Sequence, residues 1–100
     1  MTLDSTTARV TKLAENASPI GSVIKFNLKD DQGVILLNGA GEANTVTNED
    51  LPADCTVSVS VEDINALMSG DLNPMMAFMT GKIKVDGDIS VAMKLGQLFS

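Results

Sequence analysis

The chain has 100 residues, contains no histidine, tryptophan or tyrosine, and has a single cysteine, Cys55. One thiol cannot form an intrachain disulfide, and without histidine it cannot form a Cys/His zinc site. No Ser-His or Cys-His pair exists for nucleophilic catalysis, and no imidazole is present to titrate near neutral pH. We therefore predict that the protein is not an enzyme and that it uses no cofactor and no metal.

Positive charge is scarce as well. Seven Lys and Arg residues face 13 Asp and Glu residues, for a net charge of -6, and residues 41–71 contain no base at all. An acidic surface repels phosphate backbones, and three Phe residues as the only aromatics offer few stacking partners for bases. We predict no nucleic-acid partner. Residues 72–100 are nearly neutral, which leaves transient membrane contact open.

Long hydrophobic runs are missing, since the longest uncharged segments, residues 32–41 and 72–81, are too short to cross a bilayer. The N-terminus has neither a basic region nor an apolar stretch of the kind that directs export. Apolar residues make up 44% of the chain against 20% charged, which is sufficient for a core. We expect one cytoplasmic domain spanning residues 1–100.

Hydrophobic periodicity and cap residues predict four helices and five strands, and so an α+β domain. The expected helices begin at caps formed by Ser5 and Thr6, Ser60, Asn73 and Asp88, and they end at Ser18-Pro19, Gly70, Gly81 and about residue 98. The expected strands are residues 24–28, 34–37, 43–48, 55–61 and 82–86. Residues 34–37 are apolar on both faces, which predicts a strand covered on both sides.

Several short motifs are better explained by structure than by chemistry. Gly39-Ala40-Gly41 begins like a dinucleotide-binding turn, but no third glycine and no helix follow it. Asp30-Asp31 and Asp86-Gly87-Asp88 lack the twelve-residue loop of a calcium site and stand where turns and helix caps favour Asp. Cys55 lies in the apolar phase of its strand, which indicates a small core residue.

The C-terminal third is unusually apolar. Five of the six methionines lie between residues 68 and 93, and residues 74–80 carry no charge. The last expected helix has only a narrow polar line, formed by Ser90, Lys94 and Gln97. Flexible, polarizable methionines suit a cavity whose occupant varies in shape. An ordinary core or an oligomer interface has the same composition, so the oligomeric state stays open.

The second half of the chain resembles the sterol carrier protein-2 (SCP-2) family. The resemblance covers residues 53–95, where the family's sequence pieces stand in the same order and spacing. These pieces are Ala53-Asp54-Cys55-Thr56-Val57, Ala66-Leu67-Met68-Ser69-Gly70, Asn73-Pro74, Ala77-Phe78, Gly81-Lys82-Ile83-Lys84-Val85, Gly87-Asp88 and Ala92-Met93-Lys94-Leu95.

The resemblance implies a five-stranded, mostly antiparallel sheet with helices on one face, enclosing a hydrophobic tunnel. It implies a non-catalytic intracellular lipid-binding or lipid-transfer protein, whose ligand is a fatty acid, fatty acyl-CoA, phospholipid, sterol or isoprenoid. The residues expected near the tunnel are Phe26, Leu67, Met68, Met75, Met76, Phe78, Met79, Ile83, Met93, Leu95, Leu98 and Phe99. Lys82, Lys84 and Lys94 either meet a ligand head group or are simply solvated.

A second function remains open from the sequence. The apolar C-terminal third could dock on another protein, which would make the chain a protein-interaction or lipid-presenting accessory module for a lipid or quinone biosynthetic enzyme. A carrier can act as a monomer, whereas an accessory module needs a partner.

Overall fold

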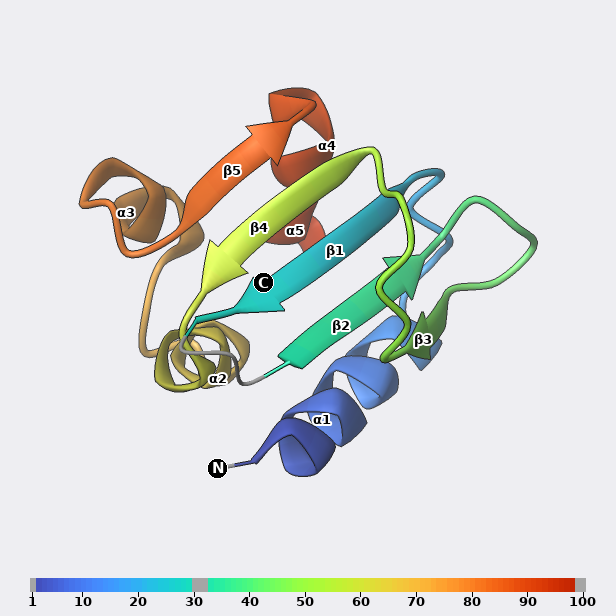
Figure 1. Ribbon diagram of the computed structural model, residues 1–100, viewed down its shortest axis with the longest axis horizontal. Coiled ribbons are helices and arrows are strands. Elements are labelled where there is room, and N and C mark those ends of the chain that lie inside the picture. Colours follow the sequence, from blue (N-terminus) through green and yellow to red (C-terminus); the bar gives the residue numbers. More distant parts are fainter. Residues whose placement is uncertain (1, 30–32, 99–100) are drawn as a thin grey trace.

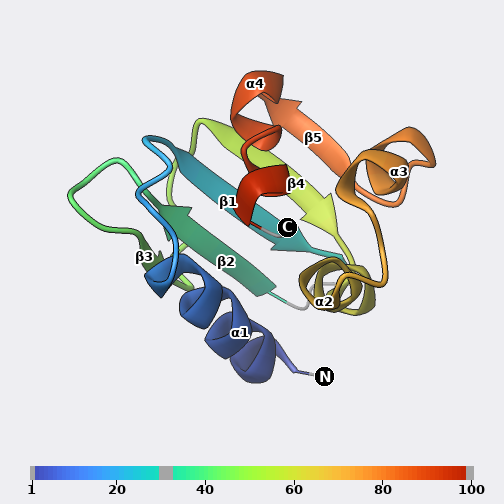
Figure 2. The ribbon, with the colours of Figure 1, turned by 180° about the vertical axis from the view of Figure 1, so that it is seen from behind.

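The computed structural model describes residues 2–29 and 33–98 as an α+β fold (Figures 1 and 2). The helices are α1 (Leu3–Glu15), α2 (Val61–Ser69), α3 (Pro74–Met79), α4 (Ile89–Ala92) and α5 (Leu95–Leu98). The strands are β1 (Val23–Leu28), β2 (Gly33–Asn38), β3 (Thr45–Thr47), β4 (Cys55–Val59) and β5 (Lys84–Gly87). No helix in these two ranges is long and apolar enough to cross a membrane.

The five strands form one sheet in the order β3-β2-β1-β4-β5. Neighbouring strands are antiparallel except for β1 and β4, which run parallel at the centre. The α+β class expected from the sequence and the mostly antiparallel sheet implied by the resemblance are thus confirmed. The predicted turn at residues 30–32, between β1 and β2, lies outside the described residues.

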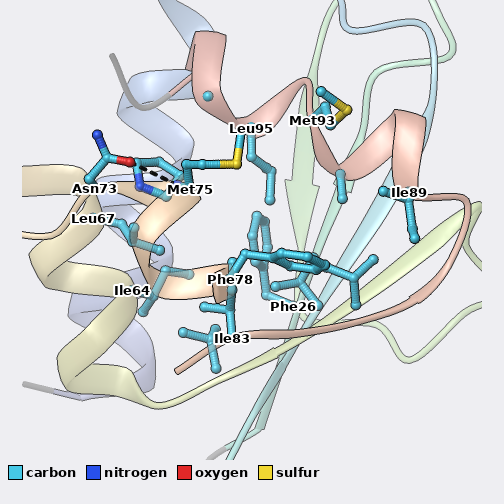
Figure 3. Close-up of a pocket in the computed structure, with 16 residues that line it drawn as sticks. Phe26, Ile64, Leu67, Asn73, Met75, Phe78, Ile83, Ile89, Met93 and Leu95 are labelled. Carbon is cyan, nitrogen blue, oxygen red and sulfur yellow. Dashed lines mark hydrogen bonds between the residues drawn. The ribbon is translucent and has the colours of Figure 1, made fainter. Parts of the chain in front are cut away.

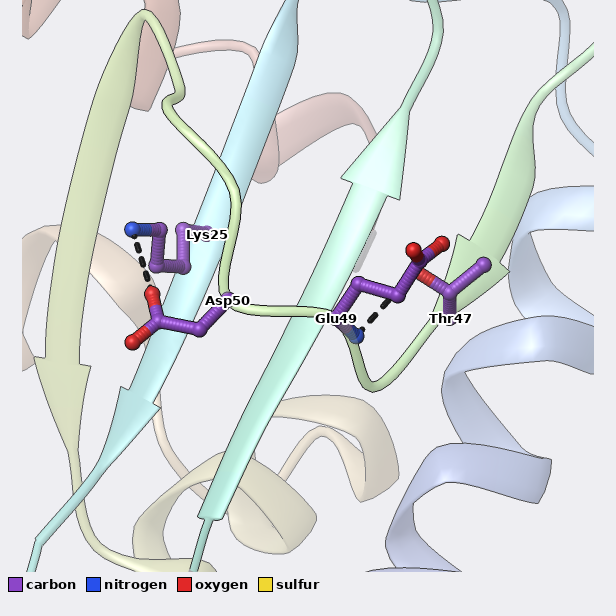
Figure 4. A network of polar contacts seen from close by, with 4 residues as sticks. All are labelled: Lys25, Thr47, Glu49 and Asp50. Atoms are coloured by element: carbon purple, nitrogen blue, oxygen red, sulfur yellow. Dashed lines mark hydrogen bonds and ion pairs between the residues drawn. The ribbon is translucent and has the colours of Figure 1, made fainter.

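The helices lie on one face of the sheet, and the segment 48–54 crosses the other face on its way from β3 to β4 (Figures 1 and 2). Polar contacts of two side chains hold this segment against the sheet. Asn48 Nδ2 donates to the Val34 carbonyl at 2.9 Å, and Asp50 forms an ion pair with Lys25 at 2.8 Å (Figure 4). Leu36 is buried, so β2 is covered on both faces, as its apolar run predicted.

Buried and less buried residues alternate along the strands, and the buried ones form the core. Every second residue of β1 and β4 is buried on the helix side, while the residues between them are less buried. Residue Val61, which continues the apolar alternation, is not in β4 but begins α2, because the Ser60 side chain accepts a hydrogen bond from the Asp63 amide and caps the helix. The predicted caps Ser60, Gly70, Asn73 and Asp88 are all confirmed.

The predicted cap of the first helix was wrong. Helix α1 begins at Leu3 and is capped by Thr2, whose side chain accepts from the Ser5 amide at 3.1 Å while Ser5 Oγ accepts from the Thr2 amide at 3.0 Å. Ser5 is therefore the third residue of a capping box. Thr6 is fully buried against α2. The Thr2 hydroxyl, which lies one turn before the predicted cap, lets the helix begin earlier, and Leu3 then packs against the core.

The predicted continuous last helix was also wrong, because it is split into α4 and α5. The backbone ladder shortens to i→i−3 bonds at Lys94, which donates to Val91, and at Gly96, which donates to Met93. At this break Lys94 Nζ donates to the Ile20 carbonyl and to Ser22 Oγ, both at 3.0 Å. These contacts tie the junction of the two helices to the chain just before β1.

A buried polar group joins α1 to α2. Asn65 is only 2% exposed, and its Nδ2 donates to Thr6 Oγ1 at 3.0 Å and to the Val61 carbonyl at 2.8 Å. Its Oδ1 accepts from Arg9 Nη1 at 2.6 Å, and Arg9 Nη2 donates to Ser69 Oγ. Because these partners are buried or partly buried, removing the amide leaves polar groups without hydrogen bonds.

We predict that Asn65→Ala lowers the free energy of unfolding by about 2 kcal/mol, because it removes three hydrogen bonds and leaves the Thr6 hydroxyl without a partner in the core. Urea denaturation followed by circular dichroism measures this change. The matched control is Asn27→Ala at an exposed position of β1, which should change stability by less than about 0.5 kcal/mol. Equal effects of the two substitutions would contradict the role given to Asn65.

Candidate functional site

A cavity of about 380 Å³ lies between the helix-side face of the sheet and helices α2 to α5 (Figure 3). Its volume is at the lower end of the range of small-molecule sites in proteins. The lining residues are Phe26, Val57, Val59, Ile64, Leu67, Asn73, Pro74, Met75, Phe78, Ile83, Val85, Ile89, Ala92, Met93, Leu95 and Gly96.

The floor of the cavity is a row of side chains across three strands. Phe26 pairs with Val57 in the parallel β1–β4 ladder, and Val57 pairs with Val85 in the antiparallel β4–β5 ladder. Residues paired in register point to the same side of a sheet, so these three side chains lie next to one another. Val59, two residues beyond Val57, extends this floor.

The walls come from short helices. Ile64 and Leu67 stand three residues apart in α2 and so share one face. Helix α3 contributes Met75 and Phe78, while α4 and the start of α5 supply the opposite wall (Figure 3). Four apolar lining residues stay exposed and form what we call the rim: Met75, Phe78, Ile89 and Met93. The site is thus a cavity with a solvent-accessible rim, and a closed tunnel stays a prediction.

The lining is almost entirely apolar. Among the residues named above, Asn73 is the only one with a polar side chain, and none is charged. The Oδ1 atom of Asn73 accepts from the Met75 amide at 2.9 Å and from the Met76 amide at 3.3 Å, where it caps α3. Such a lining favours apolar ligands through burial of their surface and offers little to fix a polar group.

Seven of the twelve residues expected near a tunnel line the cavity: Phe26, Leu67, Met75, Phe78, Ile83, Met93 and Leu95. Met76 and Met79 are exposed elsewhere on α3, Met68 lines a smaller cavity of about 230 Å³ beside α1, and Leu98 is buried in the core. Phe99 lies outside the described residues. Hydrophobic periodicity in the sequence cannot distinguish the cavity-lining residues from the exposed and the core residues, because neighbouring apolar residues of a short helix point to different sides.

Nine lining residues were not expected from the sequence: Val57, Val59, Ile64, Asn73, Pro74, Val85, Ile89, Ala92 and Gly96. The alternation of Val57 and Val59 and the helical spacing of Ile64 did indicate a core face. Gly96 has no signal of its own, and it becomes recognisable only because α5 lies over the sheet.

None of the three lysines considered for a head group lines the cavity. Lys82 and Lys84 are exposed, and the Lys94 ammonium group is used in the two hydrogen bonds that hold the α4–α5 junction. The exposure of Lys82 and Lys84 agrees with the second alternative, that these side chains are simply solvated.

The polar groups near β5 have structural roles. Cys55 is buried, and its pKa is raised by this burial and by the negative charges of Asp88, Asp86 and Asp54, so the unreactive thiol form predominates at neutral pH. Asp88 accepts from the hydroxyl and amide of Ser90 as the cap of α4, and these bonds lower the pKa of its carboxyl group. Within residues 2–29 and 33–98, no cluster of His, Cys, Asp or Glu is arranged to hold a metal.

Comparison with known proteins gives consistent results. The sequence profile of the SCP-2 sterol transfer family matches residues 3–100. Sterol carrier protein 2 from Gallus gallus is 41% identical over 86 residues, which cover 79% of this chain but only 15% of that protein. The chain thus spans about a seventh of the length of this relative.

Solved structures share the fold. The sterol carrier protein domain 2 of Helicoverpa armigera is 29% identical, with a TM-score of 0.77, over 94% of this chain and 82% of that structure. Palmitated SCP2L2 from Aedes aegypti is 25% identical, with a TM-score of 0.72, over 99% of this chain and 95% of that structure. With a family match over residues 3–100 and a fold shared with solved members, the chain belongs to the SCP-2 sterol transfer family.

Proposed function

We propose that this domain binds the long apolar chain of a lipid, such as a fatty acid or fatty acyl-CoA, in the cavity between its sheet and helices α2 to α5, and carries it without chemical change. The observation that supports this proposal is the cavity itself, which has a volume of about 380 Å³ and is lined by apolar side chains with the single exception of Asn73. The palmitated Aedes aegypti relative supports a fatty-acyl ligand.

Burial of methylene groups supplies the binding energy. Each methylene removed from water contributes about 0.8 kcal/mol, so ten give about 8 kcal/mol before the costs of association. This corresponds to a dissociation constant in the micromolar range at best. The exposed rim gives a long chain a route between solvent and cavity that requires no unfolding of the sheet.

Gly96 provides a position at which the cavity can be filled from inside. A Cβ atom added there meets no heavy atom within 4 Å, and the backbone is not in the left-handed region. Because Gly96 lines the cavity, we expect a larger side chain at this position to occupy cavity space without straining α5. Replacing a helical glycine also favours the helix by up to about 1 kcal/mol.

We predict that Gly96→Leu weakens binding of a fluorescent long-chain fatty acid about tenfold or more, because its side chain displaces at least two methylenes of the ligand. Fluorescence titration and displacement by palmitate measure the affinities. The matched control is Gly41→Leu between β2 and β3, where an added Cβ also meets nothing and the cavity is distant. Unchanged affinity of Gly96→Leu, with its melting temperature preserved, would argue against this cavity as the lipid site.

The apolar lining also predicts loose selectivity for the head group. A fatty acid, its methyl ester and the alcohol of the same length should bind within about threefold of one another, because no charged side chain lines the cavity. Affinity should instead rise with chain length from ten to sixteen carbons, by up to about fourfold per methylene, until the cavity is filled. Competition titrations at two salt concentrations test this, and a tenfold preference for the carboxylate would contradict it.

A second function, presentation of the lipid to a partner enzyme, is favoured by one observation. Met76 and Met79 project from α3 into solvent without lining the cavity, and carrying a lipid does not require them. Light scattering of the lipid-loaded protein, with and without a candidate enzyme, separates the two functions. Transfer of lipid between vesicles by a monomer supports the carrier, whereas transfer only in a stable complex supports the accessory module.

A further inference from the structure

Exposed methionines are concentrated on α3 and at the end of α4. Of the five methionines in the described ranges, four are more than half exposed: Met75 (57%), Met76 (54%), Met79 (73%) and Met93 (65%). Three of them belong to α3, and Met93 ends α4. Large apolar side chains are normally covered, so four exposed methionines, three of them on the six-residue helix α3, require an explanation.

Two of these methionines are exposed to solvent and also line the cavity. Met75 lines one wall from α3, and Met93 lines the wall opposite, at the end of α4 (Figure 3). Met76 and Met79 are equally exposed but do not line the cavity. The same two side chains that a ligand would contact are therefore accessible to small oxidants.

Peroxide converts such a thioether to a sulfoxide. A lone pair of the sulfur attacks one peroxide oxygen, the O–O bond breaks, and water leaves after proton transfer. The sulfur is oxidised by two electrons and hydrogen peroxide is reduced by two. The product is a polar side chain, and methionine sulfoxide reductases reverse the reaction with a dithiol as reductant.

A sulfoxide at Met75 or Met93 would oppose binding of an apolar chain. Its oxygen needs a hydrogen-bond donor once a ligand excludes water, since a buried polar group without a partner is costly. Among the lining residues only the side-chain amide of Asn73 offers a donor, and one amide cannot serve two sulfoxides on opposite walls. Oxidation therefore weakens binding to an otherwise apolar lining.

The single cysteine does not compete for the oxidant. Cys55 is 1% exposed and lies in the sheet below the helices, and oxidation of a thiol follows the accessibility of its thiolate. The half-buried Met68 is less accessible than the four exposed methionines.

We propose that Met75 and Met93 are a reversible oxidation site through which hydrogen peroxide lowers the affinity of this domain for long-chain lipids. The proposal rests on the lipid binding proposed above. Oxidation of Met75 and Met93 is expected to lower the affinity, whereas oxidation of Met76 and Met79, which are similarly exposed but do not line the cavity, is not. This difference allows a matched test.

The test compares the wild-type protein with Met75→Leu/Met93→Leu and Met76→Leu/Met79→Leu, each before and after treatment with hydrogen peroxide. Leu has a volume similar to Met and cannot form a sulfoxide. Because Met75 and Met93 line the cavity, the affinity of each protein for fluorescent fatty acid after treatment is compared with its own affinity before treatment. Peptide mass mapping should show one added oxygen at each exposed methionine that remains. Circular dichroism confirms that the treated proteins stay folded.

After oxidation we expect the wild type and Met76→Leu/Met79→Leu to lose affinity at least tenfold, and Met75→Leu/Met93→Leu to stay within twofold of its untreated value. A sulfoxide reductase with dithiothreitol should restore the wild type. Equal losses in both double variants, or no loss in the oxidised wild type, would overturn the oxidation site while leaving lipid binding intact. Failure of the untreated wild type to bind any long-chain lipid would overturn both proposals.

Discussion

The parallel pairing of β1 with β4 is the interaction on which the site depends. It places Phe26 beside Val57 and, through β5, Val85, so that an apolar row crosses half of the sheet. The segment 48–54 makes this pairing feasible by crossing the opposite face, where Asn48 and Asp50 fasten it. Without that crossing, β4 would have to pair elsewhere, and the cavity would have no continuous floor.

How the helices cover the sheet explains why a cavity forms. Helix α1, with 13 residues, packs on β2, β3 and α2, and its buried residues fill that half of the core. The other half is covered by α3, α4 and α5, which have only six, four and four residues. Such short helices cannot fill the space above β1, β4 and β5, and their apolar side chains line it instead. The C-terminal third is apolar because its side chains line this space and form the exposed rim.

Prediction from sequence succeeded where the controlling contact is local. The Ser60, Asn73 and Asp88 side chains cap the helices that immediately follow them, so neighbouring residues were sufficient to identify these caps. It failed where a distant contact decides the outcome. The break between α4 and α5 coincides with the bonds from Lys94 to Ile20 and Ser22, more than 70 residues away in sequence. Sequence analysis missed the lining residue Gly96 for a similar reason, since it lines the cavity only because α5 lies over the sheet.

By itself the sequence determined the α+β class, the apolar phase of β1, β4 and β5, most caps, and the absence of residues for histidine-based chemistry, because these follow from composition and from periods of two or 3.6 residues. The resemblance over residues 53–95 also led to the correct family. Only the tertiary structure decided which apolar residues face the cavity and which fill the core or remain exposed. Met75 and Met76 are adjacent and chemically identical, yet one lines the cavity and the other does not, because neighbouring helical residues point to different sides and the packing of α3 in the fold decides which side faces the cavity.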